Sequence, residues 1–342
     1  MTVPIPVEQL RALINAVPRV SLGHKPTPLE EMPRLSKELG VRILVKRDDM
    51  TGLALGGNKV RNLEFRLAEA IATGADTIIM SVDILSNSAR QTTAAATQLG
   101  LKTVLVLRGE KPQLVTGNLL VDYVLGAEII FARDETEQTR AVTEAKDRWQ
   151  RNGHTPYVLK DSPMFVISAA LAYADATLEL LDQLKELDVD LGRLHLYISS
   201  TGKGQPGLEL AVRALGLPIK VTGVAATYSD NTAKSMVANN TYEAAKYLGL
   251  KIEVQPEEID NRDDYIGPGY GLPSPEGQEA IMMAARTSGL ILDPVYTGKA
   301  FAAIIDDSRT GRLSQEDVII FFHTGGLPLM FSLADQFASI IG

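Results

Sequence analysis

The feature that most constrains the fold is a regular alternation of short apolar, β-branched runs with longer amphipathic segments. In the first half of the chain, runs of strand character lie at 41–46, 77–80, 103–107 and 128–131. Segments with helical periodicity lie between and after them, at 62–73, 86–99, 114–125 and 135–151. Three of these helices end at a glycine, Gly74, Gly100 or Gly126, as helices commonly do. This alternation is typical of parallel sheets with crossover helices, so the sequence predicts an α/β fold.

A second series of the same kind follows. Strands are predicted at 157–159, 194–199, 219–224 and 318–322, and helices at 166–186, 208–215 and 299–307. The first block is interpreted as a four-stranded lobe and the second as a larger doubly wound unit, which 342 residues can accommodate. The segment 260–275, rich in Gly, Pro and Asp, is predicted to be a long loop, and long ordered loops are often functional.

The composition excludes several kinds of chemistry and partner. The chain has no cysteine and four histidines without a metal-binding spacing, so disulfides, thiolate sites, cysteine nucleophiles and a metal centre are not expected. A net charge of -8 would repel a nucleic-acid backbone. The chain has no uninterrupted run of eighteen apolar residues, so a membrane-spanning segment is not expected. It also shows no secretory signal, so we expect a cytoplasmic location.

A first candidate site is Gly56-Gly57-Asn58-Lys59, which precedes a predicted helix. Two glycines free the backbone to approach a ligand, and the dipole at a helix N-terminus disfavours the ammonium form of a lysine, which favours a nucleophilic amine. The alternative for these four residues alone is a plain helix start that carries a surface lysine.

A second candidate is the turn between the predicted strand 194–199 and the next helix. It consists of Ser200, Thr201, Gly202, Lys203, Gly204 and Gln205. Backbone N–H groups of such a turn, together with the helix dipole, attract a phosphate. The spacing matches neither the Walker loop nor the dinucleotide fingerprint, so ATP and NAD fit poorly, and an ordinary tight turn is the alternative.

A third candidate, His323-Thr324-Gly325-Gly326, follows the last apolar strand. Ligands of open α/β sheets gather at the carboxyl ends of strands, where Thr324 offers a hydroxyl. By itself, a threonine beside two glycines is more often a turn residue than a ligand-binding one.

Six segments in a fixed order resemble the D-cysteine desulfhydrase and 1-aminocyclopropane-1-carboxylate (ACC) deaminase family, from about residue 20 to about residue 333. They are RDDMTGLALGGNK, ILSNSARQTTAAATQLGLK, GNLLVDYVLGAE, YIGPGYGLP, LDPVYTGKAFAAI and FFHTGGLPLMF. The resemblance implies the tryptophan-synthase-β type of pyridoxal 5′-phosphate (PLP) fold, fold type II. It further implies two doubly wound parallel-sheet domains with the cofactor between them, a large one at 1–50 and 162–342 and a small one at 51–161, and a homodimer.

The resemblance also implies roles for individual residues. Lys59 matches the lysine that holds PLP as a Schiff base, Asn87 matches the asparagine that faces the phenolic oxygen of PLP, and Thr324 matches the partner of its pyridine nitrogen. Ser86 matches the serine near the substrate carboxylate, and Tyr270 and Tyr296 match the two tyrosines that line the reacting face. The segment Ser200–Gln205 occupies the position of the phosphate loop. Without this context, Tyr270 and Tyr296 would be interpreted as half-buried packing residues.

Two threonines favour one reaction of this family. The deaminase branch typically has a glutamate where Thr297 stands and an apolar residue where Thr324 stands. A neutral hydroxyl stabilises a pyridinium far less than a carboxylate does, which makes the ring a weaker electron sink. Expulsion of a β-substituent discharges the electrons at once. We therefore expect a lyase that performs β-elimination on a small amino acid such as D-cysteine or cysteate, releasing a 2-oxo acid and ammonia.

Several positions depart from the family pattern. Val82, Asp83 and Leu85 replace two glycines and a glutamine of the substrate loop. Asn62 stands where relatives have a lysine near the phosphate, and we expect Lys203 to provide that positive charge instead. The substrate is therefore expected to differ from that of ordinary desulfhydrases. Two alternatives remain: cyclopropane-ring opening, as in ACC deaminase, and a PLP-binding protein that has lost catalysis.

Overall fold

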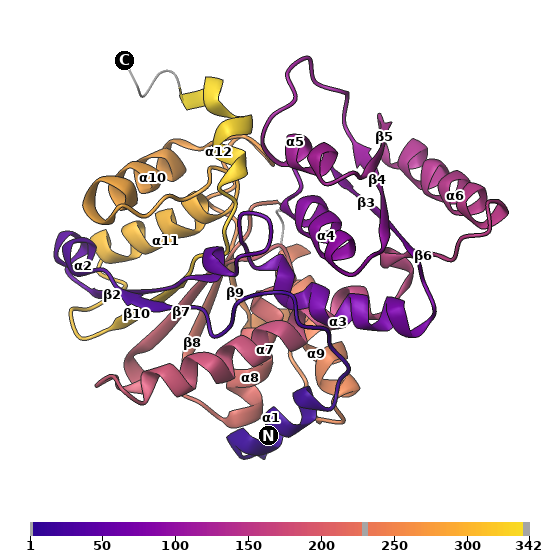
Figure 1. The fold of residues 1–342 in the computed structure, drawn as a ribbon. Coiled ribbons are helices and arrows are strands. Elements are labelled where there is room, and N and C mark those ends of the chain that lie inside the picture. The colour runs from indigo at the N-terminus through magenta and orange to yellow at the C-terminus, as the bar shows by residue number, and fades with distance from the viewer. Residues whose placement is uncertain (1–2, 228–231, 338–342) are drawn as a thin grey trace. The chain divides into compact units, whose positions relative to one another are not determined.

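The computed structural model describes residues 3–227 and 232–337, which form two compact units. Unit 1 comprises Met1–Val17, Lys25–Met50 and Ala169–Leu327, and unit 2 comprises Pro18–His24, Thr51–Ser168 and Pro328–Gly342. Each unit has its own sheet, and the colours of Figure 1 show that both the N-terminal segment and the second half of the chain contribute to unit 1. The predicted domain limits, 1–50 with 162–342 and 51–161, remain a prediction.

Unit 1 contains a six-stranded sheet. Its strands, in spatial order, are β1 (Leu29–Glu31), β2 (Arg42–Lys46), β10 (Val318–Phe322), β7 (Leu194–Ser199), β8 (Lys220–Val224) and β9 (Asp260–Arg262). All neighbours are parallel except β1, which pairs antiparallel with β2. The central strand β10 is buried at every residue, as expected for a parallel strand with helices on both faces.

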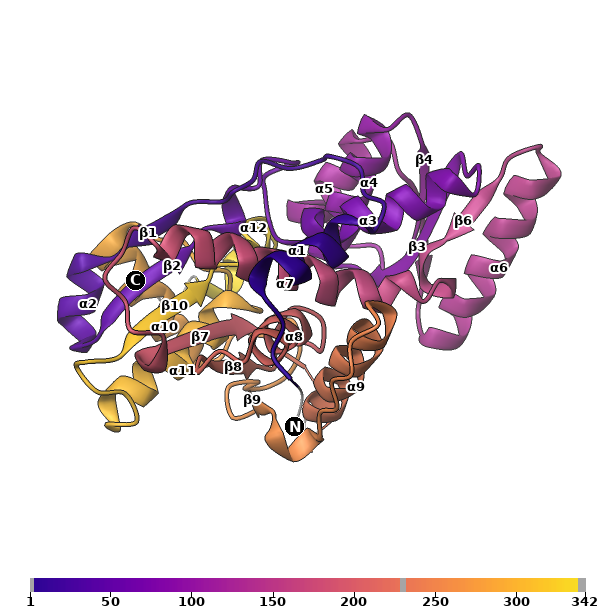
Figure 2. The same ribbon diagram turned by 90° about the horizontal axis from the view of Figure 1, so that it is seen from below.

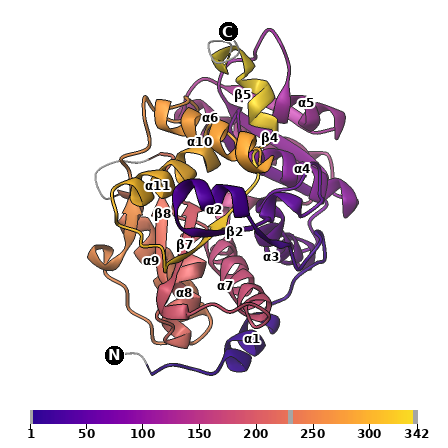
Figure 3. The ribbon, with the colours of Figure 1, turned by 90° about the vertical axis from the view of Figure 1, so that its left-hand side faces the viewer.

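Helices cover both faces of this sheet. The helices of unit 1 are α1 (Val7–Asn15), α2 (Pro33–Leu39), most of α7 (Met164–Leu184), α8 (Gln205–Leu215), α9 (Thr232–Tyr247), α10 (Pro275–Ser288) and α11 (Thr297–Arg309). Figure 3 shows α2, α10 and α11 on one side of the strands and α7, α8 and α9 on the other. Short 3₁₀ helices lie in both units at Asp48–Met50, Leu159–Asp161, Leu191–Arg193, Pro256–Glu258 and Ala334–Phe337.

Unit 2 contains a four-stranded, fully parallel sheet. Its order is β5 (Glu128–Ala132), β4 (Lys102–Arg108), β3 (Thr77–Asp83) and β6 (Pro156–Val158). Its helices are α3 (Lys59–Ala72), α4 (Asn87–Gln98), α5 (Gly117–Val124), α6 (Glu135–Arg151) and the short α12 (Pro328–Ser332). Helix α6 covers one face of the sheet, and α3, α4 and α5 lie on the other side (Figure 2). Both sheets are therefore doubly wound, as predicted.

The predicted strands all exist, but one was assigned to the wrong sheet. Strand β2, predicted at 41–46, belongs to unit 1, where it pairs with β1 and β10, and β6 is the fourth strand of unit 2. A buried apolar strand has the same pattern in either sheet, so its partners cannot be inferred from it. The predicted loop 260–275 contains β9 at its start, and the sequence did not predict α1, α2, α9, α10, α12 or β1.

Helix α7 corrects the expectation that no segment could span a membrane by composition. It has 21 residues, and the mean hydropathy of its most apolar window is 1.5. The expectation considered only uninterrupted apolar runs, whereas a window average tolerates scattered polar residues. However, 72% of this window is buried inside the structure. This burial is that of a core helix packed against its own protein.

Candidate active site

Lys59 is the first residue of α3, and the backbone before it follows an uncommon path. Ala54 (φ 42°), Leu55 (φ 70°), Gly56 (φ 69°) and Gly57 (φ 120°) all have positive φ, which costs a residue with a Cβ about 1–2 kcal/mol. Only glycine adopts the conformation of Gly57 readily. The two glycines that the sequence singled out therefore serve this turn.

Side chains of α4 hold the carbonyl groups of this loop. Arg90 Nη1 donates to the carbonyls of Ala54 and Gly56 (3.1 Å for Gly56). Gln91 Nε2 donates to the Gly57 carbonyl (3.1 Å), and Gln91 Oε1 accepts the N–H of Val60 (3.0 Å). Arg90 and Gln91, which the sequence analysis did not single out, thus fix the loop that positions Lys59.

Ser86 and Asn87 begin helix α4. Ser86 is the N-cap residue: its Oγ accepts the N–H groups of Ser88 (3.1 Å) and Ala89 (3.3 Å). The cap uses lone pairs of the oxygen only, so the hydroxyl proton can still be donated to a substrate carboxylate.

The loop before Ser86 is organised by Asp83. Its Oδ1 accepts the N–H of Leu85 (3.0 Å), and its carbonyl accepts the N–H of Ser86 (3.1 Å). The carboxylate that replaces a family glycine therefore stabilises the turn itself.

In unit 1, the turn predicted to hold a phosphate joins β7 to α8. Gly202 has a φ of 79°, its N–H lies 3.3 Å from Ser200 Oγ, and its carbonyl accepts from Asn240 Nδ2. Thr201, Lys203 and Gly204 complete the turn before α8 begins at Gln205. The N–H groups at the start of this eleven-residue helix suit an anion.

Gln205 contributes differently from its neighbours. Its Nε2 donates to the Asp260 carbonyl (2.8 Å) and its Oε1 accepts from Asn261 Nδ2 (2.8 Å), both on β9. The side chain thus ties α8 to the sheet edge.

Tyr270 and Tyr296 form a pair in unit 1. Their hydroxyl oxygens lie 2.7 Å apart and their rings meet edge to face at 64°. At this distance one hydroxyl donates to the other, so a proton can pass between the two oxygens. The structure thus joins two residues that are 26 positions apart in the sequence.

Asp293, which the sequence did not single out, shapes the segment that carries Tyr296. Its buried carboxylate accepts the N–H groups of Val295, Tyr296 and Thr297, each at 2.9 Å, and the Thr297 hydroxyl at 2.7 Å. A Cβ on Gly326, in the turn after Thr324, would lie 2.6 Å from Asp293 Cγ. Asp293 therefore organises both the Tyr296 segment and the turn packed on it.

Lys299 was also missed. Its side chain is fully buried on the first turn of α11, and its Nζ donates to the carbonyls of Ile266 (2.7 Å) and Gly269 (3.1 Å). Burial lowers the pKa of this ammonium. Because Gly269 precedes Tyr270, Lys299 supports the loop that presents Tyr270.

Thr324 follows β10 and is half-buried. Its neighbour His323 is 2% exposed, and burial lowers its pKa, so the imidazole is neutral. Its Nε2 donates to the Ile291 carbonyl (3.0 Å), which leaves Nδ1 to accept the N–H of Gly325 (3.4 Å). The histidine thereby holds the turn that carries Thr324.

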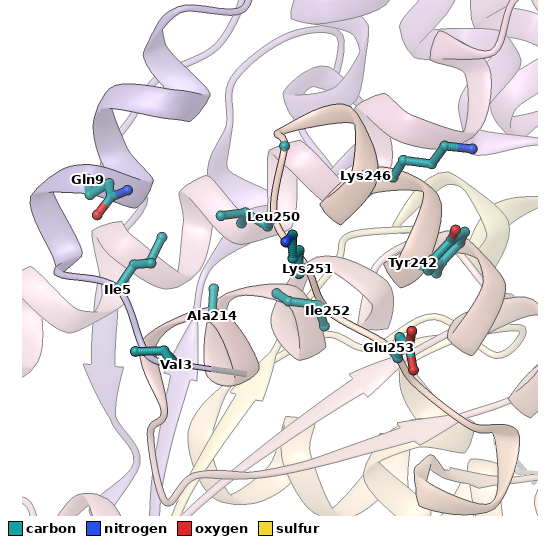
Figure 4. Close-up of a pocket in the computed structure, with 11 residues that line it drawn as sticks. Val3, Ile5, Gln9, Ala214, Tyr242, Lys246, Leu250, Lys251, Ile252 and Glu253 are labelled. Atoms are coloured by element: carbon teal, nitrogen blue, oxygen red, sulfur yellow. The ribbon is translucent and has the colours of Figure 1, made fainter. Parts of the chain in front are cut away.

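These residues fit PLP by their chemistry. Unit 2 contains a lysine amine at the start of α3 and an asparagine at the start of α4. Unit 1 contains a turn whose N–H groups suit an anion, a pair of tyrosine hydroxyls and the neutral hydroxyl of Thr324. Across 3–227 and 232–337, no group of three or more His, Asp or Glu side chains is arranged to hold a metal ion. A cavity of about 1040 Å³ in unit 1, lined by Val3, Ile5, Tyr242, Leu250 and Ile252 among others, has none of the predicted site residues in its lining (Figure 4).

Comparison with known proteins agrees with this chemistry. Residues 20–325 match the family model described as "Pyridoxal-phosphate dependent enzyme". Proteins named "Putative 1-aminocyclopropane-1-carboxylate deaminase" from Pyrococcus horikoshii and Pyrococcus abyssi are 36% and 35% identical, over 96% of this chain and 98% of each relative.

Solved structures give the same result. The crystal structure of an ACC deaminase homologue is 34% identical, with a TM-score of 0.85 over 97% of this chain and 99% of that one. Escherichia coli diaminopropionate ammonia lyase, 16% identical, shares the fold, with a TM-score of 0.68 over 99% of this chain and 94% of that one. The fold is therefore fold type II, as predicted. The chain belongs to the family of pyridoxal-phosphate dependent enzymes, is of the ACC deaminase and D-cysteine desulfhydrase type, and uses PLP as its cofactor.

Proposed function

We propose that this enzyme catalyses β-elimination on a small amino acid that carries a leaving group at Cβ, such as D-cysteine, cysteate or chloroalanine. The Cα–H bond breaks, its electron pair forms the Cα–Cβ double bond, and the leaving group departs with the electrons of its bond to Cβ. Water then hydrolyses the released 2-aminoacrylate to pyruvate and ammonia.

The observation that carries this proposal is the environment of Thr297. Its hydroxyl donates to Asp293 Oδ1 (2.7 Å) and accepts the N–H of Asp293 (2.7 Å), and the residue is fully buried. The deaminase branch typically has a glutamate at this position. In this chain the Thr297 side chain is a neutral hydroxyl that is hydrogen-bonded to Asp293 at the start of α11, so it offers no carboxylate to serve ring opening.

The residues can be given individual roles. Bound PLP supplies an electron sink for the pair released at Cα. Lys59 would hold the cofactor through its amine and would accept the α-proton of the substrate at Nζ. The Ser86 hydroxyl donates to the substrate carboxylate, and the paired hydroxyls of Tyr270 and Tyr296 deliver a proton to the leaving group. Thr324 offers the pyridine nitrogen a neutral partner, which suits a reaction without a long-lived carbanion.

We further propose that the enzyme acts as a cytoplasmic homodimer, with no nucleic-acid or membrane partner. The net charge of -8 and the burial of α7 support the latter part, and the resemblance to the family supports the dimer.

The proposed reaction is tested with purified enzyme, PLP and a panel of substrates: D- and L-cysteine, D- and L-cysteate, chloroalanine and ACC. We expect ammonia and pyruvate from at least one β-substituted amino acid at a kcat/KM well above that for ACC, whose ring opening would release 2-oxobutanoate instead. Preferred turnover of ACC would contradict β-elimination. Bound PLP without ammonia from any substrate would favour a non-catalytic binding protein.

The altered substrate loop is tested in the same panel. Because Asp83 stabilises the turn, Leu85→Gln alone restores the family amide without disturbing that turn. If an unpaired substrate group costs about 1–3 kcal/mol, this variant should raise kcat/KM for D-cysteine about fivefold or more. An unchanged value would show that Leu85 does not limit the ordinary desulfhydrase substrate.

Lys203 is expected to contribute to PLP binding as a substitute for the family lysine at the position of Asn62. A charge-assisted contact is worth about 1.5–3 kcal/mol, so Lys203→Ala should raise the PLP dissociation constant at least about tenfold. The measurement is titration of the apoenzyme with PLP, and Lys185→Ala, at an exposed lysine of the same unit, is the control. Equal constants for both variants would show that the backbone N–H groups suffice.

A further inference from the structure

Asn118 is the second residue of α5, and its side chain joins three groups of unit 2. It lies in the segment GNLLVDYVLGAE, to which neither the predicted site nor the proposed reaction assigns a role, and it is 1% exposed. Its Oδ1 accepts from Arg90 Nε (2.8 Å). Its Nδ2 donates to the Leu85 carbonyl (2.9 Å) and to Asn87 Oδ1 (3.0 Å).

The chemistry of these partners determines which way the Asn118 amide points. Arg90 Nε can only donate, so the oxygen of Asn118 must face it. The Leu85 carbonyl can only accept, so the nitrogen of Asn118 must face the loop. Both constraints agree, and a flipped Asn118 would set N–H against N–H on one side and oxygen against oxygen on the other.

This orientation passes on to Asn87. Since Asn118 presents N–H groups, Asn87 must turn its Oδ1 toward Asn118 and its Nδ2 away from it. Asn87 thereby presents a hydrogen-bond donor, which is what the anionic phenolic oxygen of PLP requires.

We propose that Asn118 is a positioning residue that sets the amide of Asn87 as a donor toward the phenolic oxygen of the cofactor. This inference rests on the proposed role of Asn87. Asn118 itself acts only through Asn87, and Arg90 is the donor-only group from which the orientation derives.

Arg90 is suited to this part because it stays charged while buried. Burial lowers the pKa of its guanidinium to about 10, partly countered by Asp122, which leaves it protonated at neutral pH. Its Nη1 binds the carbonyls of Ala54 and Gly56. One guanidinium therefore orders both the Lys59 loop and the amide of Asn87.

The test compares Asn118→Asp with Asn118→Ala. Aspartate has the shape of asparagine and can still accept from Arg90, but it cannot donate. In this variant Asn87 should therefore turn its Nδ2 toward the introduced carboxylate and its oxygen toward the cofactor. We expect Asn118→Asp to raise the PLP dissociation constant at least about tenfold. We also expect it to shift bound PLP from the yellow form, with an anionic phenolic oxygen, to the form that absorbs in the near ultraviolet.

Asn118→Ala should change both quantities less than Asn118→Asp, although it removes more contacts, because Asn87 is then able to take either orientation. A role in packing alone predicts the reverse order. The unfolding midpoint of each variant separates effects on stability from effects on the cofactor.

A double-mutant cycle shows whether Asn118 acts through Asn87. In an Asn87→Ala background, Asn118→Asp should have no further effect on the spectrum or on PLP binding. If Asn118→Asp does not fold, the same cycle is measured with Asn118→Ala, where non-additivity is again expected.

The proposal is overturned if Asn118→Asp binds PLP with the wild-type constant and spectrum, or if its effect persists in the Asn87→Ala background. It is also overturned if Asn87→Ala alone leaves the cofactor unchanged. None of these readouts uses a substrate, so they are independent of the panel that tests β-elimination.

Discussion

Replacing Lys59 with alanine is expected to abolish the covalent attachment of PLP and to lower kcat/KM by about 10⁴-fold or more. Loss of a nucleophile that also carries a proton removes two functions at once, and effects of this size are usual for such groups. Borohydride reduction followed by peptide mapping should place the cofactor on the peptide containing Lys59 in the wild type and on no peptide in the variant.

The matched control is Lys111→Ala, at an exposed lysine of the same unit, which should behave as wild type. The Lys59→Ala protein is expected to retain PLP non-covalently through the phosphate turn, and added methylamine should restore part of the lost activity. Cofactor fixed by borohydride to another lysine would refute the assignment of Lys59.

Replacing Asp293 with alanine is expected to lower the free energy of unfolding by about 3–5 kcal/mol. The carboxylate accepts three backbone N–H groups and a hydroxyl in a fully buried position, and its removal leaves those donors unsatisfied. Urea denaturation measures the loss. Activity should also fall, because the Tyr296 segment loses the group that shapes it.

Asp134→Ala provides the comparison. Asp134 also caps a helix, α6, but its side chain is exposed and accepts a single N–H, that of Glu137 (2.8 Å). Its loss should cost about 1 kcal/mol and leave activity unchanged. If the two variants were equally stable, Asp293 would be an ordinary cap, and its fourfold hydrogen bonding would carry no special weight.

Local patterns predicted the elements that depend on neighbouring residues. Strands β7 and β10 and helix α6 have the predicted bounds, since apolar runs and helical periodicity are properties of adjacent positions. The sequence did not predict the short strand β1 or the edge strand β9, because their apolar content is low. It did not predict the helix α9, because the apolar residues of α9 show only weak helical periodicity.

Outside the phosphate turn, the residues predicted to contact a ligand lie in the sequence motifs that occur in a fixed order along the chain. Lys59, Asn87 and Thr324 stand at a helix start or a strand end, where local turn and cap signals mark the position. The supporting residues had no such mark: Asp293, Lys299 and Arg90 are charged side chains whose partners lie in other segments or depend on how a turn folds. A charged residue within a sequence is usually exposed, so burial of these three could not be inferred from it.

The sequence by itself determined the fold class and the PLP chemistry, because these depend on residue type and order. The residues that contact the cofactor stay a prediction from the same order of motifs. The tertiary structure alone decided which strands pair, that Thr297 bonds to Asp293, and that the amide of Asn118 faces Asn87. Hydrogen bonds are directional and short, so they depend on positions in space to within tenths of an ångström, which residue order does not specify.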